Sequence, residues 1–421
     1  MVTTQTAVTV MADILPGHVV PLRQLLVTAG QDAANNSLLP FGKIPNVHFA
    51  RFFIIDAAFD LQGHPLSPRL ILDADVDGQG SAFLAALCSV ASAGLDSVYA
   101  HCTGYPGRAS VLDFLRDHSI PVAAHYVNTI GRTVEQIQHD AALRQAIQSF
   151  LDRTPSEWRG ADPRRVRAAI QEFVEREATL AWARRPVPAP EPAYILGEAV
   201  HAVLVGTAGI VLFPVILLGL PIWAFLLRRH EKADVARDIT PDDAHVQALA
   251  AQEDHGIQNP FTSAGLLKPG PFRRFTGTLV LWGTGVLTRH VFNRASLIGV
   301  KTIHFARWTF IDQKRRVIFT SNYDGSLENY MDDFVDKIAW GLNASFSSGL
   351  DYPKTRWLIL DGAHDEQVFK RFNLNHQLVA PFWYAAYKGL TALNIDNNAK
   401  IRAGLYGAMD DGATRAWLRR L

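Results

Sequence analysis

The chain has 421 residues, 48% of them hydrophobic, and a formal net charge of +1 at pH 7. This length fits two or three domains, and the lack of a basic stripe interleaved with aromatic residues argues against a nucleic-acid partner. The first residues lack the basic region and long apolar core of a signal peptide, so we expect a location at the cytoplasmic face.

The first 110 residues predict the order β-α-β-β-α-β, which is that of a ferredoxin-like unit. The strands are expected at 6–14, 46–56, 69–76 and 96–102, and the helices at 16–30 and 80–94. An amphipathic helix over 133–151 follows, and we assign residues 1–150 to a first domain.

Residues 151–193 predict a helical and proline-rich linker. A helix is expected over 163–184, opened by Asp162 and Pro163 as N-cap and first helical residue. Alternate prolines at 186–192 favour a stiff polyproline-type spacer.

The segment 194–230 is apolar enough to enter a lipid bilayer. Residues 199–227 contain no Asp, Glu, Lys or Arg, and a pair of arginines lies on each side. Basic residues at both ends favour both ends staying on the cytoplasmic side. We therefore predict a re-entrant helical hairpin, with its turn near Pro214 or Pro221. One spanning helix and a buried helix pair are the alternatives.

Residues 231–259 predict a solvated polar linker, and its acids and histidines have no regular ligand spacing, so we expect no metal site. Residues 260–421 form a second predicted domain with the same order of elements. Its strands are expected at 261–267, 301–312, 315–322 and 355–361, and its helices at 272–291 and 326–342.

The two predicted domains repeat one sequence pattern. VHFARFFIID at 47–56 returns as IHFARWTFID at 303–312, with six of ten positions identical. An Asp-Gly and a Tyr-Pro pair follow in each copy, separated by the same 28 positions. A third set of matches, over 126–144, recurs at a constant offset of 258 over 384–402. A repeat of this length indicates a duplicated domain rather than a solenoid.

The Asp-Gly pairs begin at Asp77 and Asp324, at the end of a predicted strand in each copy. They resemble the end of the G-x-x-D-G motif of dye-decolorizing peroxidases, although Ala74 and Ser321 replace its first glycine. The order of elements likewise resembles the dimeric α/β-barrel superfamily, which includes those peroxidases and small cofactor-free monooxygenases. The resemblance implies an α+β fold in which two tandem ferredoxin-like repeats form an intramolecular barrel around a pocket, with the hydrophobic hairpin inserted between them.

Four polar residues interrupt the apolar strands of the repeat. Strand alternation predicts that Arg307 and His304 lie on opposite faces, with Arg51 and His48 as their equivalents. Because both faces of such a sheet are covered, each group needs a buried partner. An arginine can pair with an acid such as Asp312 or Asp324, or it can hold an oxygen of a ligand in the barrel lumen. We expect the ligand-holding role for Arg307 and the acid pair for Arg51.

Asp77 and Asp324 precede predicted helices and would serve as N-caps. Asn322 beside Asp324 has Asp75 at the matching place in the first copy. Since the second copy carries the richer aromatic set, we expect it to be the working copy, with Arg307, His304 and Asp324 as catalytic candidates. The pocket-lining or structural candidates are Arg51, His48, Asp77 and Asn322.

His364 and His376 follow the last predicted strand of the second copy, where an axial haem ligand would sit. A surface or helix-capping histidine is the ordinary interpretation of each. The cofactor is otherwise unknown, and haem is one option.

Two functions follow as hypotheses. The first is a membrane-associated oxidoreductase, cofactor-free or haem-dependent, that acts on a lipid-like molecule drawn from the bilayer. The second is a non-catalytic lipid-binding or membrane scaffold protein. Assembly into a homo-oligomer is compatible with both.

Overall fold

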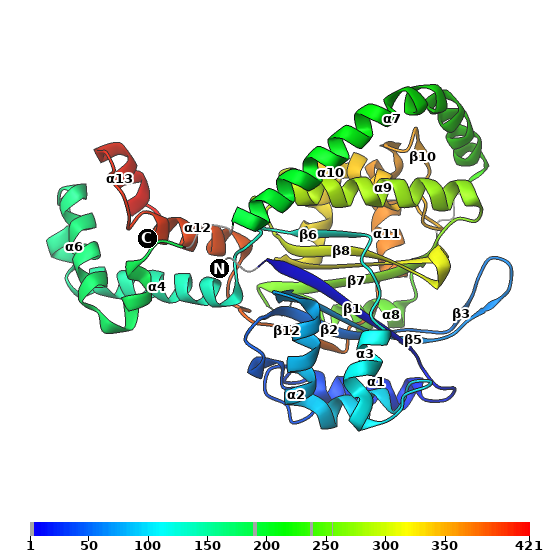
Figure 1. The fold of residues 1–421 in the computed structure, drawn as a ribbon, viewed down its shortest axis with the longest axis horizontal. Coiled ribbons are helices and arrows are strands. Elements are labelled where there is room, and N and C mark those ends of the chain that lie inside the picture. Colours follow the sequence, from blue (N-terminus) through cyan, green and yellow to red (C-terminus); the bar gives the residue numbers. More distant parts are fainter. Residues whose placement is uncertain (1–3, 188–191, 236–238, 255) are drawn as a thin grey trace.

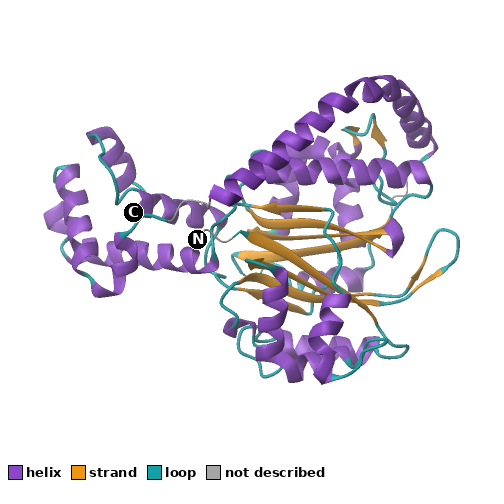
Figure 2. Ribbon diagram, in the orientation of Figure 1, coloured by secondary structure: helices purple, strands orange, loops and turns teal. Residues whose placement is uncertain are grey.

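The computed structural model describes residues 4–187, 192–235, 239–254 and 256–421. Two four-stranded antiparallel sheets face each other in the middle of the molecule, and helices cover their outer sides (Figures 1 and 2). The α+β class predicted from the sequence is therefore confirmed. Most of the proline-rich run at 186–192 lies outside the described residues.

The first sheet has the strand order β1-β5-β2-β12. Its strands are β1 (Gln5–Asp13), β2 (Val47–Ile55), β5 (Arg69–Asp77) and β12 (Phe382–Ala385). Helices α1 (Val19–Gly30) and α2 (Gly80–Tyr99) pack on its outer face. Every residue of β2 is buried, as expected for a strand covered on both faces.

The second sheet has the order β6-β8-β9-β7. Its strands are β6 (Ala124–Val127), β7 (Gln258–Leu266), β8 (Ile303–Ile311) and β9 (Arg316–Asp324). The helices on its outer side are α9 (Pro271–His290), α10 (Leu327–Phe346) and α11 (Glu366–His376).

The strands of the two sequence copies pair in the same way. β1 pairs with β5 so that Gln5 lies opposite Asp77, and β7 pairs with β9 so that Gln258 lies opposite Asp324. The register of β2 shifts after Val47, and that of β8 shifts at the equivalent place after Ile303. The duplicated sequence is thus accompanied by matched strand pairing, down to the irregularities.

The last strand predicted for each copy is wrong. Residues 96–99 continue α2, because Leu95, Val98 and Tyr99 keep a buried face at helical spacing. Residues 355–361 contain only the short pair β10 (Thr355–Arg356) and β11 (Leu360–Asp361). The fourth strand of each sheet comes instead from the other copy, since β6 pairs with β8 and β12 with β2.

The two sheets are joined at their edges but do not close into a barrel among the described residues. The segment before β6 hydrogen-bonds to the edge strand β1, with Ile120 N donating to Thr9 O at 2.9 Å. The segment before β12 does the same at β7, with Leu378 N donating to Thr262 O at 2.8 Å. These are isolated bridges, not a continuous ladder, so the predicted closed barrel is wrong.

A helical lobe projects from one end of the sheets (Figure 1). It consists of α4 (Val134–Arg153), α6 (Pro163–Arg176), α12 (Ala392–Ala403) and α13 (Asp411–Leu418). Leu143, Ile170, Ile401 and Trp417 are buried in its core. Within the segment predicted as a linker, α6 is therefore part of a packed structure that contains residues from both copies.

The hydrophobic segment forms one 42-residue helix, α7 (Pro192–Ala233), which contains Pro214 and Pro221. It is continuous, so the turn predicted for a helical hairpin is absent from it. It is nevertheless bent, and in Figure 1 it arches over α9 and returns to the body of the protein. Proline kinks a helix because it removes a backbone hydrogen bond and crowds the preceding turn.

The remaining elements are short. The helical ones are α3 (Val111–Asp117), α5 (Pro155–Trp158), α8 (Asp243–Ala250), η1 (Phe41–Lys43), η2 (Arg108–Ser110), η3 (Ala178–Arg184), η4 (Asp312–Lys314) and η5 (Gly362–His364). The strands β3 (Ala58–Phe59) and β4 (Pro65–Leu66) form a small hairpin.

Candidate functional site

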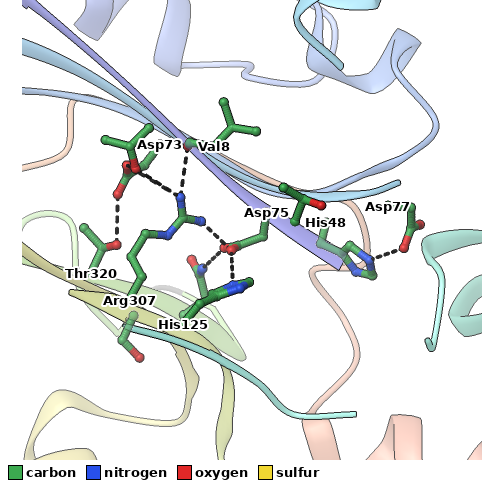
Figure 3. Close-up of polar contacts among 12 residues, drawn as sticks. Val8, His48, Asp73, Asp75, Asp77, His125, Arg307 and Thr320 are labelled. Carbon is green, nitrogen blue, oxygen red and sulfur yellow. Dashed lines mark hydrogen bonds and ion pairs between the residues drawn. The ribbon is translucent and has the colours of Figure 1, made fainter. Parts of the chain in front are cut away.

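Arg307 reaches from β8 across the space between the sheets (Figure 3). Its Nη1 donates to Val8 O at 3.0 Å and lies 3.6 Å from Asp73 Oδ1, and its Nη2 is paired with Asp75. The side chains of Arg307 and Asp75 are each only 3% exposed. Arg307 is therefore held by two carboxylates in the protein interior, which favours the structural-pair interpretation over the ligand-holding one.

Arg51 reaches from β2 in the opposite direction and finds neutral partners. Its Nη1 donates to Phe261 O at 2.7 Å and to Thr262 Oγ1 at 2.9 Å. Its Nη2 donates to Ser321 O at 2.9 Å and to the side-chain oxygen of Asn322. Burial lowers the pKa of Arg51 to about 10, although the charge of Asp73 opposes that shift. The acid partners therefore belong to Arg307, where the sequence had favoured Arg51.

The hydrogen-bonded group around each arginine includes one residue from the strand that the other sequence copy contributes to the arginine's sheet, here called the exchanged strand. His125 on β6 lies with Nε2 3.1 Å from Asp75 Oδ1 (Figure 3), and Trp383 on β12 donates from Nε1 to Asn322 Oδ1 at 3.1 Å. His125 and Trp383 are related by the 258-residue offset of the repeat. Burial alone would raise the pKa of Asp75, but Arg307 and His125 outweigh it and lower the pKa.

Sequence reasoning missed His125. A signal was present, because His125 directly precedes Tyr126, the first residue of the third repeat match, and Trp383 stands at the same place in the other copy. Asp75 in the first copy likewise matches a neutral residue, Asn322, in the second. The first copy thus carries ionisable groups at two positions where the second carries neutral ones.

A second pair of sites lies where the sheets meet the helical lobe. His48 Nε2 is 2.9 Å from Asp77 Oδ1, and His304 Nε2 is 2.7 Å from Asp324 Oδ1. Both histidines are the bulged residues at the register shifts of β2 and β8. A bulge re-aims a side chain, so His304 lies beside Phe49 of the facing sheet. The prediction that His304 and Arg307 occupy opposite faces is therefore wrong.

The other carboxylate oxygens of these pairs cap helices of the lobe. Val134 N, at the start of α4, donates to Asp77 Oδ2 at 2.8 Å, and Ala392 N, at the start of α12, donates to Asp324 Oδ2 at 2.7 Å. The helices that directly follow these acids begin after Gln79 and Ser326 instead. Asp77 and Asp324 do serve helix starts, but of helices far along the chain.

The histidines of both pairs, His48 and His304, line one small cavity of about 20 Å³. Tyr387 lies between them, with its hydroxyl 2.8 Å from His48 Nδ1, and Arg132 lines the wall. Burial and the nearby carboxylates raise the pKa of Tyr387. A space of this size holds about one water molecule, not an organic substrate.

The haem option is not supported by the positions of its ligands. His364 is exposed on η5, and His376 ends α11 with Nδ1 2.9 Å from Phe372 O. The two lie at opposite ends of an 11-residue helix, about 15 Å apart at 1.5 Å per residue. Asp324 is committed to His304 and to Ala392. These residues do not converge on one cavity, so they do not fit a haem site.

A larger cavity, of about 100 Å³, lies between the second sheet and the helices α9 and α10. None of its lining residues carries a charge. Its wall includes Leu287, Trp308, Phe319, Tyr330, Phe334 and Ile338. Trp308 Nε1 is buried and has no hydrogen-bond acceptor among the described residues. The cavity can therefore take an apolar group of a few carbon atoms, and Trp308 Nε1 and the Tyr330 hydroxyl are unpaired polar atoms at its wall within the described part of the chain.

Next to this cavity the protein exposes apolar helices. By length and composition α2 and α7 could each cross a membrane, but 39% of the apolar window of α2 is buried against 6% for α7. Ile210 and Leu218 of α7 are 77% and 78% exposed. Along α9, Phe275, Leu279 and Trp282 are also exposed and lie on one face at helical spacing.

Both ends of α7 are fixed to the same side of the protein. Near its start, Glu198 pairs with Arg289 at the end of α9, at 2.6 and 2.8 Å. Near its end, Trp223 Nε1 donates to Thr276 Oγ1 at 3.2 Å, close to the start of α9. The buried carboxylate of Glu231 accepts hydrogen bonds from the backbone N–H groups of Trp357 and Leu358. The bent helix α7, called the arch below, is thus attached to the body of the protein at both ends, its feet, near Glu198 and near Trp223 to Glu231.

Comparison of the chain with protein-family models, with curated proteins and with solved structures finds no match. Function is therefore inferred from these residues and their contacts alone.

Proposed function

We propose that the protein is a membrane-associated lipid-binding protein at the cytoplasmic face, which inserts α7 into one leaflet and holds the end of an apolar chain in the cavity between the second sheet and the helices α9 and α10. The observation that carries the proposal is the position of the uncharged cavity beside two helices with exposed apolar faces. Contiguous apolar surface of this kind is costly in water and marks contact with lipid or protein.

The anchors of α7 limit how deeply it can insert. The contour from Glu198 to Trp223 is about 38 Å at 1.5 Å per residue, whereas their partners on α9 are about 20 Å apart. A bent helix with these ends rises roughly 15 Å above α9, about half of the ~30 Å hydrocarbon core. The geometry favours a re-entrant arch over a spanning helix and supports the single-sided topology predicted from the repeat.

The foot of the arch carries groups suited to the membrane interface. The guanidinium of Arg228 lies 5.3 Å from the ring centroid of Trp357, which is 49% exposed. Tryptophan and arginine favour the headgroup level, where an apolar body and a polar end are both solvated. The exposed row on α9 would then lie flat against the same leaflet.

Binding is better supported than catalysis at the apolar cavity. Its wall has hydrogen-bonding groups but no acid, base or charged side chain. The predicted catalytic residues Arg307, His304 and Asp324 are engaged with other protein groups. The oxidoreductase hypothesis stays a prediction, and no arrangement among the described residues supports it.

Liposome flotation tests the membrane proposal. We expect the wild-type protein to float with vesicles and the variant Leu212→Glu/Ile216→Glu to stay in the soluble fraction, because two charges on α7 would have to leave water. Val20→Glu, at an exposed apolar position of α1, is the matched control and should float. Equal flotation of all three proteins would refute insertion of α7.

Topology is tested by cysteine labelling. Arg185 and Lys232 are exposed and precede and follow the apolar part of α7, so each is replaced singly by cysteine in a background without Cys88 and Cys102. A membrane-impermeant maleimide should label both from the same side of sealed vesicles. Labelling from opposite sides would establish a spanning helix and overturn the arch.

Occupancy of the cavity is tested by filling it. Met331→Trp adds an indole to the wall and should reduce co-purifying lipid, measured by mass spectrometry after organic extraction, without reducing flotation. Unchanged lipid content in a folded variant would remove the cavity from the proposal.

A further inference from the structure

A crevice of about 580 Å³ opens where the edge strands β1 and β6 separate. The segment leading to β6 is bound to β1 as far as Ile120 and then crosses to the other sheet. The crevice lies in the resulting gap, with Thr4 and Gln5 on one side and His125 on the other. The start of α7 and the end of α9 complete its wall, so it opens at one foot of the arch.

His125 lines this crevice and has one ring nitrogen that is not used by Asp75. Its Nε2 faces Asp75 Oδ1 at 3.1 Å, and Asp75 is held ionised by its pairing with Arg307. A carboxylate only accepts hydrogen bonds, so Nε2 carries a proton, and in the neutral form of the imidazole Nδ1 is then an acceptor. The side chain of His125 is 19% exposed, in contrast to the buried His48 and His304.

The equivalent position in the other half lacks this acceptor. Trp383 occupies the place of His125 and can only donate, to an asparagine in place of Asp75. Both halves therefore keep one hydrogen bond between the exchanged strand and the sheet opposite. A histidine and an aspartate are not needed for that bond, which points to a separate task for the first half.

The surroundings select the kind of ligand. The nearest charges at the mouth, Arg289 and Glu198, neutralise each other in a bidentate pair. Val122, Ala123 and Ile130 supply apolar wall beside Tyr194. Thr288 lines both this crevice and the apolar cavity, so only the last turns of α9 separate the two spaces. A neutral polar group joined to an apolar chain matches this arrangement.

We propose that the crevice binds the neutral, hydroxyl-bearing head group of an amphipathic lipid, which donates a hydrogen bond to Nδ1 of His125. The inference deepens the lipid-binding function proposed above and rests on it. The apolar chain of the same molecule would lie along α9 toward the apolar cavity. The working half for the polar end is then the first copy, through Asp75 and His125, together with Arg307 from the second.

The test compares two probes that differ in the hydroxyl groups. 1-Monooleoylglycerol and methyl oleate are titrated into the full-length protein in detergent micelles, and binding is followed by calorimetry. We expect His125→Phe to weaken monooleoylglycerol binding about five- to tenfold, as loss of one hydrogen bond implies, and to leave methyl oleate unaffected. Trp383→Phe, the matched change in the other half, should alter neither.

A second measurement does not depend on a variant that folds. In wild-type protein labelled with ¹⁵N-histidine, the Nδ1 resonance of His125 should move toward its hydrogen-bonded position with monooleoylglycerol and stay in place with methyl oleate. An unmoved resonance, or equal monooleoylglycerol affinity of wild type and His125→Phe, overturns the inference. Binding of methyl oleate in that case leaves the lipid-binding function standing, whereas binding of neither probe overturns both.

Discussion

Replacement of the two strand arginines separates a charge-compensating residue from a neutral one. In Arg307→Ala, Asp73 and Asp75 lose the only guanidinium in contact with them among the described residues, while both stay buried at about 2% exposure. Removing one partner of a buried ion pair costs about 3 to 5 kcal/mol, because the remaining charge is uncompensated. We expect the free energy of unfolding to fall by that amount.

Arg51→Ala should cost less. Its partners are two backbone carbonyls, a hydroxyl and an amide, which lose hydrogen bonds but carry no charge. Each buried neutral acceptor left unpaired costs about 1 to 3 kcal/mol, but Asn322 Oδ1 keeps its bond from Trp383, and the loss of a guanidinium whose charge burial disfavours offsets part of the cost. Asp73 and Asp75 retain Arg307 in this variant.

Urea denaturation followed by circular dichroism measures both values. Asp75→Asn provides the matched control, because it gives Arg307 the amide partner that Arg51 already has in Asn322. The double variant Arg307→Met/Asp75→Asn should recover part of the loss of Arg307→Ala. A cost for Arg51→Ala equal to or above that for Arg307→Ala would refute the assignment of the acid pair.

Three further predictions concern pH, packing and the helical lobe. Burial raises the pKa of Glu253 to about 7, although the hydrogen bond from Gln377 opposes that shift, so ionisation of Glu253 disfavours the folded state. The free energy of unfolding should therefore fall as the pH rises from about 4.5 to about 7. Urea midpoints measured across this range should show the fall for the wild type and a flatter slope for Glu253→Gln. Gly94→Ala should destabilise the protein by about 1 to 3 kcal/mol, because the added Cβ would lie 1.8 Å from Leu38 O. Gly283→Ala has open space around the added Cβ and should stabilise α9 by about 0.5 to 1 kcal/mol. Thermal melts of the two variants measure both effects. Asp77→Ala and Asp324→Ala should each cost about 2 kcal/mol and speed amide exchange at the start of α4 and α12 respectively, and unchanged protection there would contradict the capping role.

The strands and helices that depend on local pattern were predictable. β2 and β8 were located within two residues because their apolar runs and shared HFAR sequence mark buried strands. The duplicated order of elements followed from the repeat. The bent course of α7 was predictable only in part, since two prolines indicate a bend but not that the helix stays continuous.

The pairing partners of the exchanged strands were not predictable from local pattern. β6 and β12 are four residues each, and nothing in a short apolar run distinguishes a strand of its own sheet from one of the opposite sheet. Once they exchange, each copy completes the other's sheet, so the separate domains 1–150 and 260–421 read from the sequence share both sheets and the helical lobe.

The exchange also explains why the ionisable cluster around Arg307 could not be predicted. Arg307 belongs to the second copy by sequence, and the acids considered for it, Asp312 and Asp324, belong to the same copy. Strand exchange brings His125 beside it and packing of the sheets brings Asp75, so the ionisable cluster combines an arginine of one copy with an acid and a histidine of the other. A comparison of the copies shows that Asp75 and His125 have diverged and that Arg307 has not. Only the fold shows that these three residues meet. A search for function in a duplicated chain of this kind has to pair each copy's residues with the other copy's sheet.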